Sequence, residues 1–322
     1  MITSYAAEDG RLRPVEDALA DLGRAVWIDM LNPSVPEEEA VQADIGVALP
    51  TRAEMEEIEI SSRLYYEDGA AFMTAILPAH ADGDDVQMAP VTFALAGERL
   101  VTVRYHDPRV FRTFAQKCEK SGSGGTSAEA VLMGLLEAIV DRLADILERA
   151  ARDIDGISRS IFERGSQPRR GRDFQDVLEG IGRKGDLLSN IRDSLMTLER
   201  MFGFLGQVIP PRGGDPAIRA RLKSLVRDAR SLTDHASFLS QKNTFLLDAI
   251  LGMINIEQNA IIKIFSVAAV VFLPPTLIAS IYGMNFVHMP ELAWLAGYPI
   301  ALVLMIVSAI LPFVYFRYRR WL

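Results

Sequence analysis

Two long apolar runs lie close together near the C-terminal end of this chain of 322 residues. The first, over residues 264–281, contains no charged side chain and ends in the polar turn 282–285. Its length is close to the roughly 18–20 apolar residues that cross the core of a bilayer. A second run covers residues 298–316. We therefore expect a transmembrane domain of two helices over residues 261–322, preceded by a large soluble part.

The stretch before the first span carries few helix breakers. From residue 217 to residue 273 it contains no proline and a single glycine, and Pro216 suits the first position of a helix. A helix from Pro216 to Gly283 would contain about 68 residues and measure roughly 100 Å. Such a helix can cross the bilayer and also extend far into the cytoplasm. Pro274 and Pro275 lie inside the span and should kink or loosen it there.

Small and polar residues recur every seven positions along this helix. We call two such rows the seam, and their members are Asn259, Ser266, Leu273 and Ser280 in one row and Ile262, Ala269, Thr276 and Gly283 in the other. Towards the N-terminus the seam continues through Asp248, Gly252 and Asn255. A repeat of seven is the spacing of coiled coils, and membrane helices also pack through small residues. The seam therefore indicates either helix–helix packing or the lining of a pore, which two spans alone cannot enclose.

Residues 1–120 have the pattern of an α/β domain. Five short runs bounded by Gly, Asp and Pro predict strands over residues 24–30, 62–67, 70–77, 88–95 and 99–104. The tripeptides 67–69 and 96–98 suit hairpin turns. Helices are expected over residues 36–45 and after Thr51, because the spacing from Thr51 to Glu54 is that of a capping box.

Helices should dominate from residue 121 onward. A Gly- and Ser-rich joint over residues 121–125 precedes Thr126, whose spacing to Glu129 again suggests a capping box. Apolar residues then recur at helical spacing, and a second helical pattern covers residues 173–207. We predict a helical bundle and stalk over residues 121–260.

Composition narrows the function. The chain carries 42 acidic and 34 basic residues, a formal net charge of −8, which argues against a nucleic-acid partner. A single cysteine, Cys118, excludes an internal disulfide and a Cys-rich zinc site. The sequence contains no phosphate-binding loop, metalloprotease motif or nucleophile elbow, and its four histidines lack metal-ligand spacing. Neither an enzyme nor a cofactor is indicated.

The distribution of charges predicts the orientation in the membrane. Between residues 264 and 316 the only formal charge is Glu291, whereas Lys263 precedes the first span and three arginines follow the second. Positive charge on one side of both spans places both termini in the cytoplasm and the connecting loop outside. The N-terminus has no apolar signal core, which favours a cytoplasmic soluble part.

The polar turn after the first span resembles the signature of the CorA family of magnesium channels. Gly-Met-Asn stands at residues 283–285, and Met-Pro-Glu-Leu follows at residues 289–292. The similarity continues over residues 252–259, 263–265 and 272–276, and more weakly over residues 26–29 and 51–59. Gly-Met-Asn between two spans, with a basic tail, is a specific combination, and the resemblance covers essentially the whole chain.

This resemblance implies a funnel-shaped homopentamer in the lipid of the bacterial inner membrane, which carries Mg²⁺, and also Co²⁺ and Ni²⁺, and is closed by cytoplasmic Mg²⁺. It places the family's pore residues on the matching positions Asp248, Asn259, Ile262, Phe265, Leu273, Thr276 and Asn285. The remaining candidates for the ion pathway are Ser280, Gly283 and Met284.

The chemistry of these residues suits a hydrated ion. Mg²⁺ dehydrates reluctantly, and Asn285 offers a neutral oxygen that accepts a hydrogen bond from a coordinated water. Ile262, Phe265 and Leu273 would form apolar constrictions that gate by dewetting. The span contains no Asp, Glu or His for a proton relay. Transport should therefore be passive and driven by the membrane potential.

One departure from the family pattern bears on the ion. Val287 stands where the family often has an acidic residue, His288 follows it, and Glu291 is the acidic residue that remains in this loop. Capture of cations could be weaker, or the loop could favour a softer ion. The alternatives are a zinc-transporting relative that shares Gly-Met-Asn, transport of nickel or cobalt, and a membrane-tethered binding protein whose spans only anchor it.

Regulation needs carboxylates in the soluble part. Hydrated Mg²⁺ can bridge carboxylates of neighbouring subunits, and Asp228 and Asp234 on the long helix are the candidate sensors. Glu67 and Asp68 of the α/β domain are possible partners across the interface. For each residue singly, ordinary surface charge is an equally good interpretation.

Overall fold

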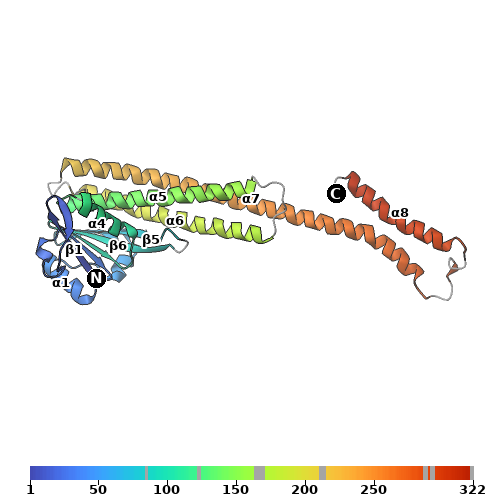
Figure 1. Cartoon of the computed structure of the whole chain (residues 1–322), viewed down its shortest axis with the longest axis horizontal. Helices are drawn as coiled ribbons and strands as arrows, with labels where there is room; N and C mark the ends of the chain where they lie inside the picture. Colours follow the sequence, from blue (N-terminus) through green and yellow to red (C-terminus); the bar gives the residue numbers. More distant parts are fainter. Residues whose placement is uncertain are drawn as a thin grey trace. The chain divides into compact units, whose positions relative to one another are not determined.

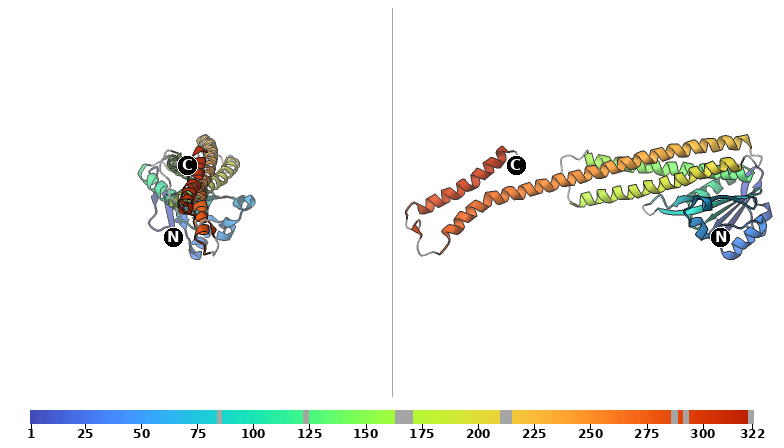
Figure 2. Two further views of the ribbon diagram at one scale, coloured as in Figure 1. Left: turned by 90° about the vertical axis from the view of Figure 1, so that its right-hand side faces the viewer. Right: turned by 180° about the vertical axis from the view of Figure 1, so that it is seen from behind.

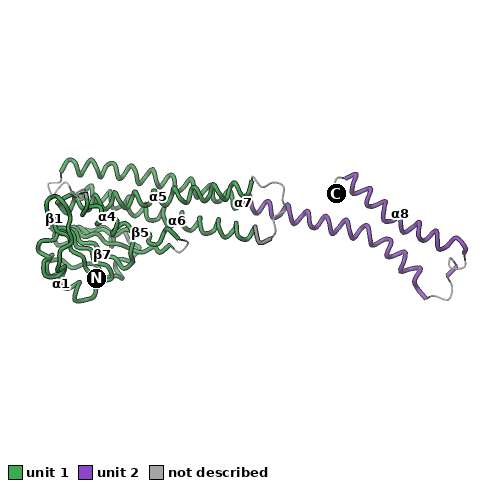
Figure 3. Tube along the Cα trace, viewed as in Figure 1, with its two compact units in different colours: residues 1–247 green, residues 248–322 purple. Residues whose placement is uncertain are grey.

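The computed structural model describes residues 1–83, 86–121, 125–162, 171–209, 215–285, 289–290 and 294–319. The chain divides into two compact units, Met1–Leu247 and Asp248–Leu322 (Figure 3). The first unit holds a sheet and a helical bundle. The second holds the C-terminal part of a long helix and a separate apolar helix. The α/β domain, the long helix and the apolar helices expected from the sequence are all present.

A single seven-stranded sheet forms the base of the first unit. Its order is β2-β1-β3-β7-β6-β5-β4. The strands are β1 (Ile2–Glu8), β2 (Arg11–Pro14), β3 (Trp27–Leu31), β4 (Leu64–Glu67), β5 (Ala70–Ala79), β6 (Gln87–Ala96) and β7 (Arg99–Arg104). The pair β3–β7 is parallel, and every other neighbouring pair is antiparallel. The parallel pair joins segments that are far apart in the sequence and lies in the middle of the sheet.

All five predicted strands are present, four of them with shifted ends. The strand over residues 99–104 is β7 without change. The strand predicted from residue 24 begins only at Trp27, because Leu22–Arg24 form a short 3-10 helix. The strand predicted from residue 62 begins at Leu64, because helix α3 (Ile60–Arg63) precedes it. Strands β1 and β2 were not predicted.

Helices cover both faces of the sheet. Helices α1 (Val35–Ile45) and α2 (Arg52–Glu56) lie on one face, and α4 (Arg109–Ser121), α5 (Ala128–Phe162) and α6 (Gly171–Val208) lie on the other (Figure 1). Strand β3 shows why, because side chains alternate across a strand. Ile28 and Met30 pack in the core on the side of α1 and α2, whereas Trp27 contacts the ring of Phe114 on α4.

Local capping sets where two helices begin. Thr51 and Glu54 form the predicted capping box at the start of α2. At α5 the prediction of a box led by Thr126 was wrong. The helix begins at Ala128, and the hydroxyl of Ser127 accepts a hydrogen bond from the Ala130 amide at 3.2 Å.

The long helix is present as α7 (Pro216–Tyr282), with 67 residues and with both prolines of the span inside it. Asp215 caps its start, since its carboxylate accepts a hydrogen bond from the Ala217 amide at 2.8 Å. Within the first unit, α5, α6 and the beginning of α7 run side by side (Figure 2). Helix α8 (Gly297–Tyr318) follows. Helices α7 and α8 are the two described helices that are long and apolar enough to cross a membrane.

Candidate ion pathway

The seam lies on an exposed face of α7. A shallow groove on this helix is lined by Ala269, Phe272, Leu273, Thr276, Leu277 and Ser280. Four of these six residues belong to the seam predicted from the sequence. The repeat of seven therefore gathers small, hydroxyl and apolar side chains along one concave strip of the second unit.

In the monomer, the large apolar side chains of the predicted constrictions are exposed. Ile262, Phe265 and Leu273 leave 60%, 71% and 66% of their surface exposed. Exposed apolar surface on this scale marks contact with lipid or with another protein. Asn259 and Asp248, further back on the helix, are also exposed. This face of α7 is therefore expected to be covered by lipid or by another protein.

The end of α7 explains the glycine of the signature. The Gly283 amide donates a hydrogen bond to the Ala279 carbonyl at 2.9 Å. A Cβ atom on Gly283 would lie 3.1 Å from that same carbonyl oxygen, which is tighter than most Cβ contacts and would require the backbone to shift slightly. Met284 and Asn285 follow and are exposed. Phe286, Val287, His288 and Glu291 lie outside the described residues.

Thr276 is already engaged with its own helix. Its hydroxyl donates to the Phe272 carbonyl at 2.7 Å, a local bond that Ser and Thr commonly make inside helices. The hydroxyl hydrogen of Thr276 is therefore occupied by this bond, and the lone pairs of its oxygen remain available to accept hydrogen bonds. A coordinated water donates hydrogen bonds, so this is the polarity that a hydrated cation requires.

The sensor candidates lie in the first unit. Asp228 and Asp234 are exposed on α7, and Glu67 and Asp68 are exposed at the β4–β5 turn. The charge of Asp228 acts on Asp141, a carboxylate of α5. Burial raises the pKa of Asp141, and the negative charges of Glu137, Asp145 and Asp228 raise it further. Within the described part of the chain, no three His, Cys, Asp or Glu residues are grouped so that they could hold a metal ion.

Sequence reasoning missed a buried polar network in the sheet. The Arg104 guanidinium donates to both carboxylate oxygens of Asp29, from Nε at 3.0 Å and from Nη2 at 2.7 Å. The Thr102 hydroxyl also donates to Asp29, at 2.8 Å, and accepts from Trp27 Nε1 at 3.0 Å. The sequence does contain a signal of this network: Asp29 is a charged residue in the middle of the otherwise apolar strand Trp-Ile-Asp-Met-Leu.

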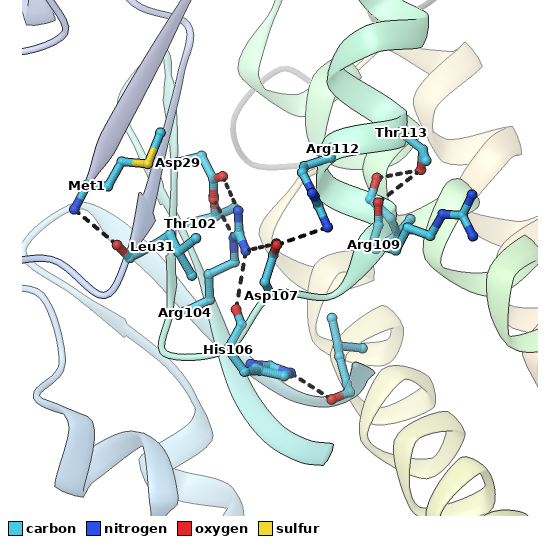
Figure 4. Close-up of polar contacts among 12 residues, drawn as sticks. Met1, Asp29, Leu31, Thr102, Arg104, His106, Asp107, Arg109, Arg112 and Thr113 are labelled. Carbon is cyan, nitrogen blue, oxygen red and sulfur yellow. Dashed lines mark hydrogen bonds and ion pairs between the residues drawn. The ribbon is translucent and has the colours of Figure 1, made fainter. Parts of the chain in front are cut away.

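The network continues to the start of α4 (Figure 4). Arg104 Nη1 donates to Asp107 at 2.8 Å and to the His106 carbonyl at 3.2 Å, and Asp107 also pairs with Arg112 at 3.2 Å. Burial lowers the pKa of Arg104, but the hydrogen bonds and charges of Asp29 and Asp107 outweigh it, so the pKa is raised. These bonds join two central strands to the helix that covers them.

The environment of His106 predicts that acid weakens the fold of this unit. Its ring is buried, Nε2 lies 2.8 Å from the Leu77 carbonyl, and Nδ1 has no partner in the described chain. Burial lowers the pKa of His106, and the charge of Arg104 adds to this.

The unfolded chain therefore binds a proton first, so stability is retained above about pH 6.5 and falls as the pH drops below it. We expect the melting temperature to fall between pH 7.5 and pH 5, and His106→Gln to reduce that fall. An identical pH profile in the variant would contradict this.

Comparison with known proteins assigns the family. Residues 23–320 match the family model described as CorA-like Mg²⁺ transporter protein. The magnesium transport protein CorA of Pectobacterium atrosepticum is 37% identical over 324 residues, and that of Escherichia coli K12 is 36% identical over 323 residues, each covering 100% of both chains. The complete structure of the CorA magnesium transporter from Methanocaldococcus jannaschii covers 100% of this chain and 99% of its own, with a TM-score of 0.79 and 18% identity. The resemblance stated from the sequence is thus confirmed: this chain belongs to the CorA-like Mg²⁺ transporter family.

Proposed function

We propose that this chain forms a homo-oligomeric channel, a pentamer by family resemblance, through which Mg²⁺ enters the cell passively across the bacterial inner membrane. The observation that carries this proposal is the exposed seam of α7, which ends at Gly-Met-Asn. Neither a free monomer nor a simple membrane anchor requires small and polar residues at every seventh position on an exposed helix face. Several copies packed around an axis would turn these residues inward.

Ion selection is assigned to Asn285. A ring of amide oxygens at the outer end of the pore would accept hydrogen bonds from the water shell of Mg²⁺ without removing it. A charged ring would hold the ion too tightly to release it. Ser280 and Thr276 would offer further hydroxyl acceptors along the path. Co²⁺ and Ni²⁺, which also form hexahydrates, would be carried by the same filter.

The driving force is the membrane potential. With both termini and the large soluble unit in the cytoplasm, a divalent ion moving inward gains about 4.6 kcal/mol per 100 mV. No nucleotide chemistry is needed. Mg²⁺ is then the substrate, and cytoplasmic Mg²⁺ is the signal that closes the pore.

Leu273 is the proposed constriction, and its removal gives a prediction. Leu273→Gly should keep the pore conducting at millimolar cytoplasmic Mg²⁺, because a wider and less apolar constriction stays wet. Val270→Gly is the control, since it also replaces an exposed apolar residue of the same helix by glycine but lies outside both the seam and the groove. The measurement is Mg²⁺ influx into proteoliposomes loaded with Mg²⁺. If the Leu273 variant still closes, the gate lies elsewhere, at Ile262 or Phe265.

Closure is assigned to carboxylates of the soluble unit. A cation that bridges subunits in the closed arrangement, and not in the open one, shifts the population towards closure. Asp228→Asn combined with Asp234→Asn should therefore raise influx at millimolar cytoplasmic Mg²⁺ and remove protection by Mg²⁺ against proteolysis. The control exchanges two exposed aspartates of α6, Asp176 and Asp193, for asparagine. Closure and protection that survive the first double change would make both residues ordinary surface charge.

Two other functions remain to be separated from this one. A zinc-transporting relative would give flux that Zn²⁺ saturates and Mg²⁺ does not inhibit. A tethered binding protein would give no flux at all. Uptake of Mg²⁺ by proteoliposomes, measured with competing Zn²⁺, Co²⁺ and Ni²⁺, distinguishes all three.

A further inference from the structure

Among the described residues that line one cavity of the first unit, guanidinium groups outnumber carboxylates. It has a volume of about 610 Å³ and lies between the end of β5, the start of α4 and the side of α5. Arg109, Arg112 and Arg142 line it, and Arg149 adjoins it through Asp82. A cavity of this size falls in the range of small-molecule sites.

Asp82 gathers three of these arginines. Its carboxylate lies 2.6 Å from Arg142, 2.6 Å from Arg149 and 3.2 Å from Arg109. The hydrogen bonds from Arg142 and Arg149 are the main cause of a strongly lowered pKa, so Asp82 stays ionised. These four described side chains, one carboxylate and three guanidinium groups, carry a net positive charge. Asp107, the partner of Arg112, is already shared with Arg104.

The arginines differ in how free they are to turn. Arg109 and Arg112 leave 67% and 68% of their side chains exposed, whereas Arg142 and Arg149 leave 23% and 34%. Arg109 also makes the longest of the three contacts to Asp82. The two exposed arginines can therefore move towards a ligand while the other two keep Asp82 in place.

The start of α4 adds to the positive field. This helix begins at Arg109 and has 13 residues; Arg109 and Val110 of its first turn and the preceding Pro108 line the cavity. The amide groups at a helix start carry a partial positive charge and favour anions. Guanidinium forks and helix starts are both suited to phosphate oxygens.

We propose that this cavity binds a small soluble anion that carries phosphate groups, held by Arg109 and Arg112 and completed by Arg142. Asp82 is then a built-in competitor, which the ligand displaces from Arg109. Asp84 and Asp85 lie outside the described residues. The proposal does not depend on the transport activity, because binding can be measured without flux.

Calorimetric titration of the full chain, in detergent free of phospholipid, tests this with inorganic triphosphate as the probe. Saturable binding is expected at moderate salt. Arg109→Gln combined with Arg112→Gln should weaken it at least about tenfold, since charge-assisted hydrogen bonds are lost. The matched control is Arg24→Gln combined with Arg52→Gln, two exposed arginines elsewhere in the unit, and it should leave binding unchanged.

A second pair of variants tests the role of Asp82. Asp82→Asn should tighten triphosphate binding, because it releases guanidinium groups, and Asp44→Asn, which changes the net charge equally, should not. Equal effects of site and control variants would show general attraction of charge and overturn the proposal. So would the absence of saturable binding at millimolar triphosphate. Binding of a short-chain phosphatidylglycerol alone, lost in the Arg109 and Arg112 variant, would replace the soluble anion by a lipid headgroup.

Discussion

Asn285→Ala should abolish selective Mg²⁺ uptake while leaving folding and assembly intact. The side chain is exposed and, among the described residues, nothing in its own chain bonds to it, so its removal costs the fold little. Each subunit would lose an acceptor for the water shell of the ion. Hydrogen bonds to charged groups are worth about 1.5–3 kcal/mol each. Loss from several subunits should lower influx by at least about 100-fold.

The measurement is initial Mg²⁺ influx into proteoliposomes at fixed potential, with competition by Co²⁺ and Ni²⁺. Gln258→Ala is the control, because it removes an exposed amide from α7 at a position outside the seam. Assembly is checked by the size of the detergent-solubilised oligomer. Normal influx with unchanged competition would refute the assignment of the filter, whereas loss of the oligomer would show a structural role instead.

Arg104→Met should destabilise the first unit by about 3–5 kcal/mol, because it leaves the Asp29 carboxylate buried without its partner. Arg104 is 3% exposed and makes four hydrogen bonds, two of them to Asp29. The change should appear as a lower midpoint of chemical unfolding, followed by tryptophan fluorescence, to which the buried Trp27 contributes. Methionine retains much of the length of arginine, so the main loss is electrostatic.

Two comparisons make that result decisive. Arg99→Met breaks a partly exposed ion pair with Asp44 and should cost no more than about 1 kcal/mol. Asp29→Leu added to Arg104→Met should recover part of the loss, since no buried charge then remains unpaired. A cost for Arg104→Met as small as that for Arg99→Met would mean that water reaches Asp29.

The long elements could be predicted because their signals are local. An uninterrupted helical stretch and two apolar runs determine α7 and α8 wherever they pack. Strand β2 is too short for such a signal, and of its four residues only Leu12 is buried. The turn before it was readable, however, because Asp9-Gly10 has positive φ angles of 50° and 74° and is a typical hairpin pair.

The buried network could not be predicted by the same means. Asp29 meets Thr102 and Arg104 because β3 and β7 pair in parallel, with Asp29 opposite Thr102. Nothing near Asp29 in the sequence specifies which distant strand will lie beside it. The seam is an intermediate case. The repeat of seven could be recognised in the sequence, and the exposure of these residues on α7 is consistent with a contact surface. Whether several copies place the seam around an axis depends on the assembly and cannot be read from one chain.

The pairing of β3 with β7 also sets an order of events during synthesis. The sheet cannot close until residue 104 has been made, and the pairing of distant segments is slow compared with helix formation. At about 5–20 residues per second, the ribosome reaches the first apolar run on the order of 10 s later. The sheet therefore has time to close before a hydrophobic segment emerges to recruit the insertion machinery.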